Sequence, residues 1–268
     1  MKKLIILLLL TYCFGAFSQS KFELIKEYDY SYPQFSTDPL GNIYFINNAE
    51  LIKIDFRTNQ KVSYSNNLSG KISSIDVSDP FRIVLYNKVF NKISFLDNRL
   101  AEITSTISIN DLDYYNVAAV CQSNSGGFWI FDQNLDELIY FNQNLEQQKK
   151  SSQISSLFDP EKELGEIFML EKNDYIYLGI KDQGVLLFDV YGTYIKSFPI
   201  SDIEHFQVVD NKIIYYKMGK LRLYNTQTFT LKDLDLPIDN ALDVRFEQNK
   251  IFILTMEKVV IYRINNIK

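Results

Sequence analysis

The chain contains a single histidine, His205, so a catalytic site would have to be built mainly from other groups. Metal sites and nucleophile–base triads usually use histidine beside matched partners. His205 follows Glu204 at the entrance to a predicted strand, where it could act as a general base or serve as a hydrogen-bonded loop residue. No Gly-x-Ser-x-Gly elbow, Cys-x-x-Cys pair, phosphate loop or EF-hand spacing occurs. The sequence therefore assigns no catalytic residue and no metal ligand.

Acidic residues are concentrated in four segments that precede predicted strands. Residues 110–116, 155–166, 201–205 and 239–243 hold ten Asp and Glu against Lys162 alone. One of them combines carboxylates with neighbouring tyrosines, as binding surfaces commonly do, although ordinary solvated loops are the alternative. The candidate binding residues are Asp111, Asp113, Tyr114, Tyr115, Glu204, His205 and Asp243. Tyrosine rings also stack on sugars, so both a protein and a glycan ligand stay open.

A strand that ends in an acidic or amide residue recurs along the chain and would position these segments. The six copies are Leu51 to Asp55, Ile93 to Asp97, Leu138 to Asn142, Val185 to Asp189, Leu221 to Asn225 and Val259 to Arg263, the last of which lacks the Asp or Asn. They recur every 36 to 47 residues. Periods of this size are typical of propeller blades. We interpret the terminal Asp or Asn as a turn cap rather than a metal ligand, because these side chains hydrogen-bond the backbone two residues on.

Each recurring strand is preceded by an apolar strand, such as Ile43 to Ile46 or Phe128 to Phe131, which suits a sheet covered on both faces. The sixth unit stops after its third strand, and residues 22–30 form a strand with no blade of its own. Alternation in this strand predicts one face made of Phe22, Leu24, Tyr28 and Tyr30 and another made of Glu23, Ile25, Glu27 and Asp29. Adding that strand to the sixth sheet would remove two open edges. The predicted fold is all-β: a six-bladed β-propeller of four-stranded antiparallel blades, closed by the N-terminal strand. Asp159 and Pro160 also predict a short helix in the longest connector.

On these repeats the mature chain resembles the six-bladed propeller superfamily, including secreted NHL-repeat domains. The resemblance covers the whole mature chain and is one of architecture. Trp129 is the only tryptophan, so the tryptophan-docking pattern of quinone-dependent propellers is absent, as is the Gly-His to Trp-Asp pairing of WD repeats. The resemblance implies a fold and not a function.

The N-terminus predicts export. Lys2 and Lys3 precede an apolar run from Leu4 to Leu10, and the small residues Ala16 and Ser18 follow, which is typical of a signal peptide over residues 1–18. The predicted domains are this signal peptide and a single propeller over residues 19–268. Acylation of Cys13 is the alternative, although Tyr12 before it is unsuited to a lipobox. When Cys13 is removed with the signal peptide, Cys121 is the only mature cysteine, and we interpret it as a buried small hydrophobe.

The formal charge of −5 becomes more negative when Lys2 and Lys3 are removed, which disfavours nucleic acid and anionic lipid as partners. No apolar window after the leader is long enough to span a membrane. We therefore expect a monomeric, non-enzymatic periplasmic module that binds a protein or glycan at the loops around a central channel. The alternative is a metal-dependent propeller hydrolase or lyase, similar to a lactonase, because carboxylates and amides alone can hold Ca²⁺ at the channel mouth.

Overall fold

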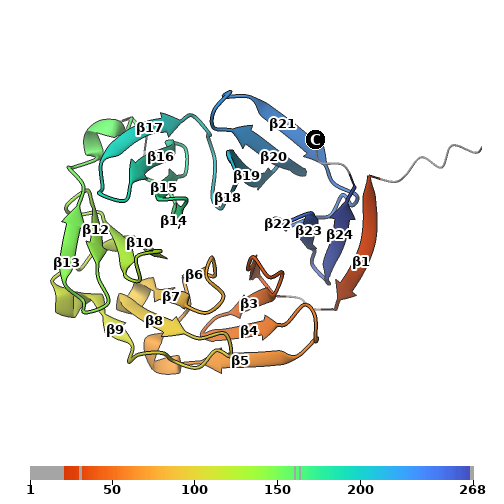
Figure 1. Cartoon of the computed structure of the whole chain (residues 1–268), viewed down its shortest axis with the longest axis horizontal. Helices are drawn as coiled ribbons and strands as arrows, with labels where there is room; N and C mark the ends of the chain where they lie inside the picture. The colour runs from red at the N-terminus through yellow and green to blue at the C-terminus, as the bar shows by residue number, and fades with distance from the viewer. Residues whose placement is uncertain (1–20, 30–31, 160, 163, 266–268) are drawn as a thin grey trace, which may run out of the picture.

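A computed structural model describes residues 21–29, 32–159, 161–162 and 164–265. The predicted signal peptide and Cys13 lie outside these residues. Six four-stranded antiparallel sheets follow one another around a ring (Figure 1). The chain is a six-bladed β-propeller, as the repeats predicted. Within the described residues, no helix is long and apolar enough to cross a membrane.

Blades 1 to 5 each use four consecutive strands, and blade 6 combines both ends of the chain. The inner strands are β2 (Gln34–Thr37), β6 (Ser74–Asp76), β10 (Val117–Gln122), β14 (Ile167–Lys172), β18 (Gln207–Val209) and β22 (Asp243–Glu247). The second strands are β3 (Ile43–Asn47), β7 (Ile83–Asn87), β11 (Phe128–Asp132), β15 (Tyr175–Ile180), β19 (Lys212–Lys217) and β23 (Lys250–Leu254).

The remaining strands form the outer half of each blade. The third strands are β4 (Glu50–Ile54), β8 (Lys92–Leu96), β12 (Glu137–Phe141), β16 (Gly184–Asp189), β20 (Lys220–Asn225) and β24 (Val259–Ile264). The outer strands are β5 (Lys61–Ser65), β9 (Ile107–Ser108), β13 (Gln147–Lys150), β17 (Tyr194–Phe198), β21 (Leu231–Asp235) and, in blade 6, β1 (Phe22–Tyr28). Four short 3₁₀ turns lie in the connections: η1 (Asn67–Ser69), η2 (Lys88–Phe90), η3 (Ile109–Leu112) and η4 (Ser155–Leu157).

The core consists of six apolar clusters, one between each pair of neighbouring blades. This arrangement explains why the second and third strands are apolar on nearly every residue, since both of their faces are covered. Cys121 is fully buried in the cluster between blades 3 and 4, as predicted. Burial raises the pKa of its thiol well above the usual value.

The predicted turn caps at the ends of the third strands are confirmed. The Asp55 carboxylate accepts hydrogen bonds from the backbone N–H groups of Arg57 and Thr58. The corresponding side chains in blades 2 to 5 do the same two to four residues on; they are Asp97, Asn142, Asp189 and Asn225. These residues therefore shape the turns and are not a ring of ligands.

The N-terminal strand closes the ring, as predicted, but its side chains alternate differently. Phe22 pairs with Ile264 and Tyr28 with Val259, and a bulge shifts the register between Leu24 and Lys26. The prediction that Phe22, Leu24 and Tyr28 share one face of the strand is wrong: Phe22 packs in the cluster between blades 5 and 6, whereas Ile25 and Tyr28 pack in the cluster between blades 6 and 1. The bulge is the cause, because one extra residue reverses the alternation of side chains.

The helix predicted from Asp159 is also not formed in the described residues. The connector holds η4 and then a turn in which the Asp159 carboxylate accepts from the backbone N–H of Glu161. The capping interaction is therefore present, but it stabilises a turn, because Asp caps helices and turns by the same hydrogen bond.

Candidate functional site

The inner strands of five blades line a central channel with a volume of about 690 Å³. They are β2, β6, β14, β18 and β22. Strand β10 of blade 3 contributes no lining residue, and all six of its side chains are buried. Its small residues Ala118 and Ala119 pack in one cluster with Met169 of β14. The channel is therefore bounded mainly by blades 1, 2, 4, 5 and 6.

Antiparallel strands bring two sets of connections to one face of the ring. These are the segments that enter the inner strands and the hairpins that join second to third strands. We call this side the loop face; the other hairpins and the chain ends Lys21 and Asn265 lie opposite. The four acidic segments all belong to the loop face, as the repeat predicted.

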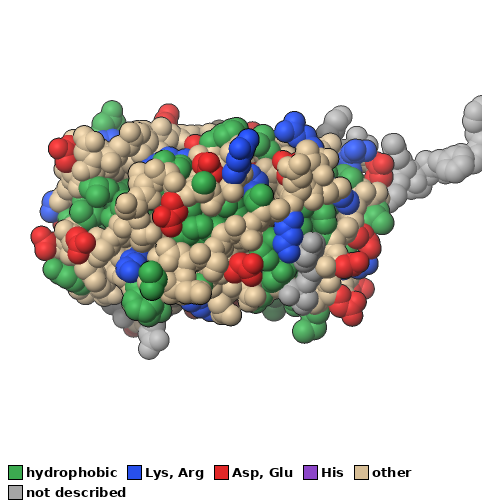
Figure 2. All heavy atoms as spheres, turned by 90° about the horizontal axis from the view of Figure 1, so that it is seen from below, with side chains coloured by type: hydrophobic (Ala, Val, Ile, Leu, Met, Phe, Trp, Pro, Cys, Tyr) green, Lys and Arg blue, Asp and Glu red, His purple; other side chains and the backbone are tan. Residues whose placement is uncertain are grey.

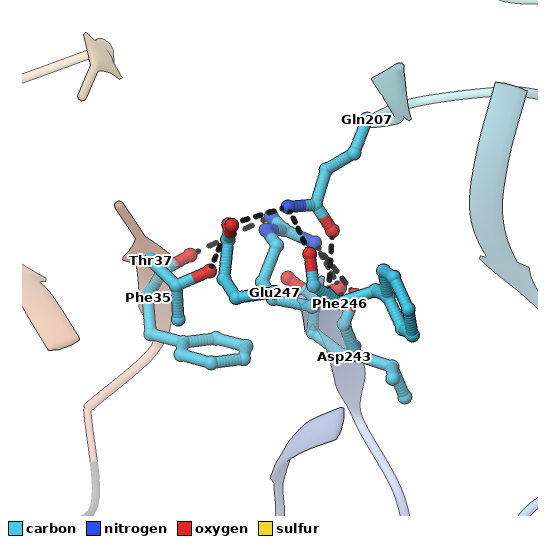
Figure 3. Close-up of polar contacts among 8 residues, drawn as sticks. Phe35, Thr37, Gln207, Asp243, Phe246 and Glu247 are labelled. Atoms are coloured by element: carbon cyan, nitrogen blue, oxygen red, sulfur yellow. Dashed lines mark hydrogen bonds and ion pairs between the residues drawn. The ribbon is translucent and has the colours of Figure 1, made fainter. Parts of the chain in front are cut away.

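Glu247 on β22 forms a hydrogen-bonded link between three blades in the channel wall (Figure 3). Its Oε1 accepts from Thr37 Oγ1 of β2 at 2.9 Å and from Gln207 Nε2 of β18 at 2.9 Å. The Gln207 side chain also pairs with the backbone of Phe246, donating to its carbonyl and accepting from its N–H. Blades 5, 6 and 1 are thus joined at the axis by polar side chains as well as by apolar packing.

The Glu247 carboxyl is largely removed from solvent, and this burial raises its pKa to about 7. The nearby charge of Asp38 raises the pKa further, while the hydrogen bonds from Thr37 and Gln207 and the charge of Lys172 lower it. Near neutral pH the group therefore exchanges between its charged and neutral forms, which is unusual for a glutamate.

Arg245 lies two residues before Glu247 and supplies a matched cation in the channel wall. Its Nη1 atom is 2.6 Å from Asp243 Oδ1, and the guanidinium carbon is 5.4 Å from the centre of the Phe35 ring. Only 12% of the Arg245 side chain is exposed. The arginine therefore neutralises Asp243 and fixes its orientation at the entrance of β22.

Three of the predicted site residues line the channel: Glu204, His205 and Asp243. The His205 ring meets the edge of Phe168 at 5.2 Å, and Lys181 Nζ donates to Glu204 Oε1 at 2.6 Å. His205 is open to the water of the channel, although protein atoms surround it on most sides. This enclosure and the charge of Arg245 lower the pKa of His205, against the opposing effect of Asp243 and Glu204. The imidazole is therefore neutral at neutral pH.

The other four predicted residues are not among those that line the channel. They lie on η3 and the segment after it, before blade 3: Asp111, Asp113, Tyr114 and Tyr115. The Tyr114 ring packs on Phe141, and its hydroxyl donates to Gln147. The Tyr115 hydroxyl donates to Asp113, and its ring is exposed. Asp113 and Tyr114 line a separate open groove of about 420 Å³ beside blade 3, so the predicted set is divided between two places.

The acidic character of the loop face is partly neutralised by cations from other elements. Ion pairs join Asp159 to Lys162, Asp202 to Lys217, Glu204 to Lys181 and Asp243 to Arg245. Lys181 and Lys217 stand on second strands or their hairpins, outside the segments where the acids were counted. The described residues contain no group of three or more His, Cys, Asp or Glu side chains that could hold a metal ion.

Arg245, Glu247, Gln207 and Thr37 were not predicted as site residues. A signal for the first two was present in the alternation of residues 243–247, where Asp, Arg and Glu alternate with the buried Val244 and Phe246. In an inner strand this pattern turns every charged side chain toward the axis.

No family model matches this chain, and no curated protein sequence matches it significantly. Solved structures share its fold. A streptogramin B lyase is 13% identical, with a TM-score of 0.60 over 91% of this chain and 88% of that one. A chain of the mitotic checkpoint complex is 7% identical, with a TM-score of 0.65 over 99% of both chains. BamB from Moraxella catarrhalis is 9% identical, with a TM-score of 0.55 over 90% and 97%. Identities this low support the propeller architecture alone.

Proposed function

We propose that this chain is an exported, non-enzymatic binding module of the cell envelope, resident in the periplasm, that holds a protein or glycan ligand at the channel mouth on the loop face. The observation that carries the proposal is the open cavity of about 690 Å³ lined there by Glu204, His205, Asp243 and Phe168. Ligand sites are commonly concave, of this size, and lined by apolar walls with a few placed polar groups. The basic and apolar N-terminus supports export.

The charges at the mouth favour recognition by hydrogen bonds over attraction of a strongly basic ligand. Glu204 and Asp243 are both paired with cations, and neutral His205 can donate from one ring nitrogen and accept at the other. Phe168 and Leu242 supply apolar area beside them. A protein loop or an oligosaccharide carries the matching mixture of apolar surface and hydroxyl, amide or carbonyl groups. At the level of fold analogy, the neighbour from the mitotic checkpoint complex shows a propeller working in a protein assembly.

Site-specific photocrosslinking tests the proposal in the native envelope. A photoreactive residue at Leu242, which lines the cavity and is exposed, should give a discrete protein adduct or a glycan adduct. The matched control is Leu231 on the outer strand β21, which is similarly exposed but lies away from the channel. Adducts at Leu231 and none at Leu242 would place the binding surface on the outer strands and contradict the proposal.

A metal-dependent hydrolase or lyase is the second candidate, and His205 is the observation that favours it. A neutral imidazole beside Glu204 in a channel could accept a proton, and three of the similar structures are lyases. Elemental analysis after extensive dialysis distinguishes the candidates. A stoichiometric divalent ion that survives dialysis, and is lost in Asp243→Asn, would favour the enzyme; an ion-free protein that still gives the Leu242 adduct would favour the binding module.

A further inference from the structure

Two turns on the loop face of blades 1 and 2 place apolar side chains in water. Turn η1 carries Leu68, which is 86% exposed, and η2 carries Val89 and Phe90, which are 79% and 51% exposed. We call residues 66–71 and 87–92 the paired turns. Hairpin tips usually carry Asn, Asp, Gly or Ser, because those residues suit turns and water. Phe90 packs on Gly70 of the neighbouring turn, but Leu68 and Val89 have no explanation in the folding of the turns themselves.

The paired turns are held together as one unit. The Phe90 ring covers Gly70 so closely that it leaves no room for a Cβ atom there. Lys92 Nζ donates to the Leu68 carbonyl at 3.2 Å, and Asn87 Nδ2 donates to the Gly70 carbonyl at 2.9 Å. The exposure of Leu68 and Val89 is therefore a property of an ordered surface and not of a loose segment.

Three lysines accompany the apolar side chains: Lys71, Lys88 and Lys92. Among the described residues, none of the three forms an ion pair. The nearby Glu102 accepts instead from Tyr64 and Asn66. The paired turns are thus basic and apolar, whereas the segments before blades 3 to 6 carry acids. The segment before blade 3, with Asp111 and Asp113, adjoins η2, since Asn91 donates to Asn110. Figure 2 looks at the outer edge of the ring at blades 1 and 2, where hydrophobic, basic and acidic side chains all reach the surface.

We propose that the paired turns dock this propeller on an anionic lipid bilayer. Leu68, Val89 and Phe90 enter the headgroup layer, and Lys71, Lys88 and Lys92 lie at the level of the lipid phosphates. Apolar insertion and lysine–phosphate attraction are the two contributions that hold peripheral proteins on membranes. The docked orientation turns the loop face, and with it the channel mouth, toward the membrane.

The shape of the paired turns favours a bilayer over a protein partner. The apolar side chains stand at the tips of two projecting turns, so a protein would need a hollow that matches both tips. A fluid headgroup layer can surround such a projection without a preformed site. The three lysines, which form no ion pair among the described residues, add an attraction that depends on lipid charge and not on the sequence of a partner.

The net negative charge of the chain predicted weak attraction to anionic lipid, but that prediction averages over the whole surface. Screening limits charge interactions to about 8 Å at physiological ionic strength. Blades 4 and 5, with their acidic segments, lie across the ring from blades 1 and 2 (Figure 1). The lysines can therefore contact headgroups while the acids before blades 4 and 5 remain outside the range of strong repulsion. Asp111 and Asp113, in the segment that contacts Asn91, are the acids that oppose this attraction.

Vesicle co-flotation tests the proposal, using the chain from Gln19 onward so that the apolar leader cannot bind lipid. The protein should float with vesicles of phosphatidylcholine and phosphatidylglycerol, less so as salt rises, and should not float with pure phosphatidylcholine. Leu68→Ser with Val89→Ser should weaken binding about tenfold or more. Each change of Lys71, Lys88 or Lys92 to Ala should weaken it about fivefold.

The matched control is Met218→Ser with Met256→Ser, which removes exposed apolar side chains from the loop-face hairpins of blades 5 and 6. This variant should bind vesicles as the parent protein does. Thermal melts of all variants verify that they are folded, and Leu68 and Val89 are chosen because they are more exposed than Phe90. No flotation of the parent protein, or equal losses in the control and the Leu68/Val89 variant, would overturn the proposal.

Discussion

The channel wall of blades 5 and 6 and the paired turns of blades 1 and 2 depart from the usual distribution of residues in opposite directions. In the channel wall, Arg245 and Glu247 are charged or titratable groups held away from solvent by matched partners. In the paired turns, Leu68 and Val89 are apolar and exposed, and the neighbouring lysines have no anion partner among the described residues. Departures of both kinds are expected at functional sites, because the fold alone would not select them.

The channel wall and the paired turns are both formed only when the ring is closed. Opening the ring should therefore lower the free energy of unfolding more than any other change. Removing residues 21–28 deletes β1, exposes the edge of β24 and uncovers the contacts of Phe22, Ile25 and Tyr28. We expect a loss of about 5 kcal/mol or more, comparable with the whole stability of a domain, together with aggregation through the free edge. Thermal unfolding and light scattering measure both.

The control for this deletion is a chain that begins at Lys21 and keeps β1. It should remain monomeric with an unchanged melting temperature. A deletion variant that also stays monomeric and melts at the same temperature would show that β1 does not close the ring.

Removing Arg245, the cation of the channel wall, should cause the next largest loss of stability. Arg245→Ala leaves Asp243 without its partner and uncovers Phe35, so we expect a loss of about 2 to 3 kcal/mol in urea unfolding. The matched control is Arg263→Ala, which breaks the exposed pair with Glu23 and should cost about 1 kcal/mol or less. Equal losses of stability in the two variants would mean that the ion pair in the channel wall contributes no more than an exposed one.

Replacing the titrating glutamate should change how stability depends on pH. The folded-state pKa of Glu247 is raised to about 7 from its usual value of 4.5, so the charged carboxylate destabilises the fold increasingly as pH rises through this window, and fully above it. Glu247→Gln keeps an oxygen that can accept from Thr37 and Gln207. The substitution should raise the free energy of unfolding by about 2 kcal/mol at pH 8 and leave it unchanged at pH 4. Urea unfolding across this range measures the difference. A gain that is the same at both pH values would contradict the assignment.

Truncating the paired turns should affect stability least. Leu68→Ala should change the free energy of unfolding by about 0.5 kcal/mol or less, since the side chain is already in water. The same substitution at Leu51, fully buried between blades 1 and 2, should cost about 2 to 5 kcal/mol. Chemical denaturation of the two variants measures the contrast. A large loss at Leu68 would mean that this side chain serves the fold.

Most of the architecture could be predicted from the sequence, because a propeller blade repeats a local pattern. The spacing of the recurring third strands, the terminal Asp or Asn and the unpaired strand at residue 22 depend on hydrogen bonding and alternation within a few residues. Predictions from local patterns were wrong where a single residue changes the local backbone structure. The bulge between Leu24 and Lys26 placed Phe22 and Tyr28 on opposite faces of β1, and the cap at Asp159 began a turn in place of a helix.

The sequence by itself determined the number of blades, the closing strand and the position of Glu204, His205 and Asp243 at the entrances of inner strands.

Only the tertiary structure decided which side chains contact one another. Asp111 and Tyr115 share a sequence context with His205, yet the course of η3 leaves them outside the channel lining. Thr37 reaches Glu247 because closure brings the first blade against the last. Leu68 and Val89 lie in different blades and become one surface through Phe90 and Gly70. Contacts between distant segments depend on how the blades stack, and no short stretch of sequence encodes that geometry.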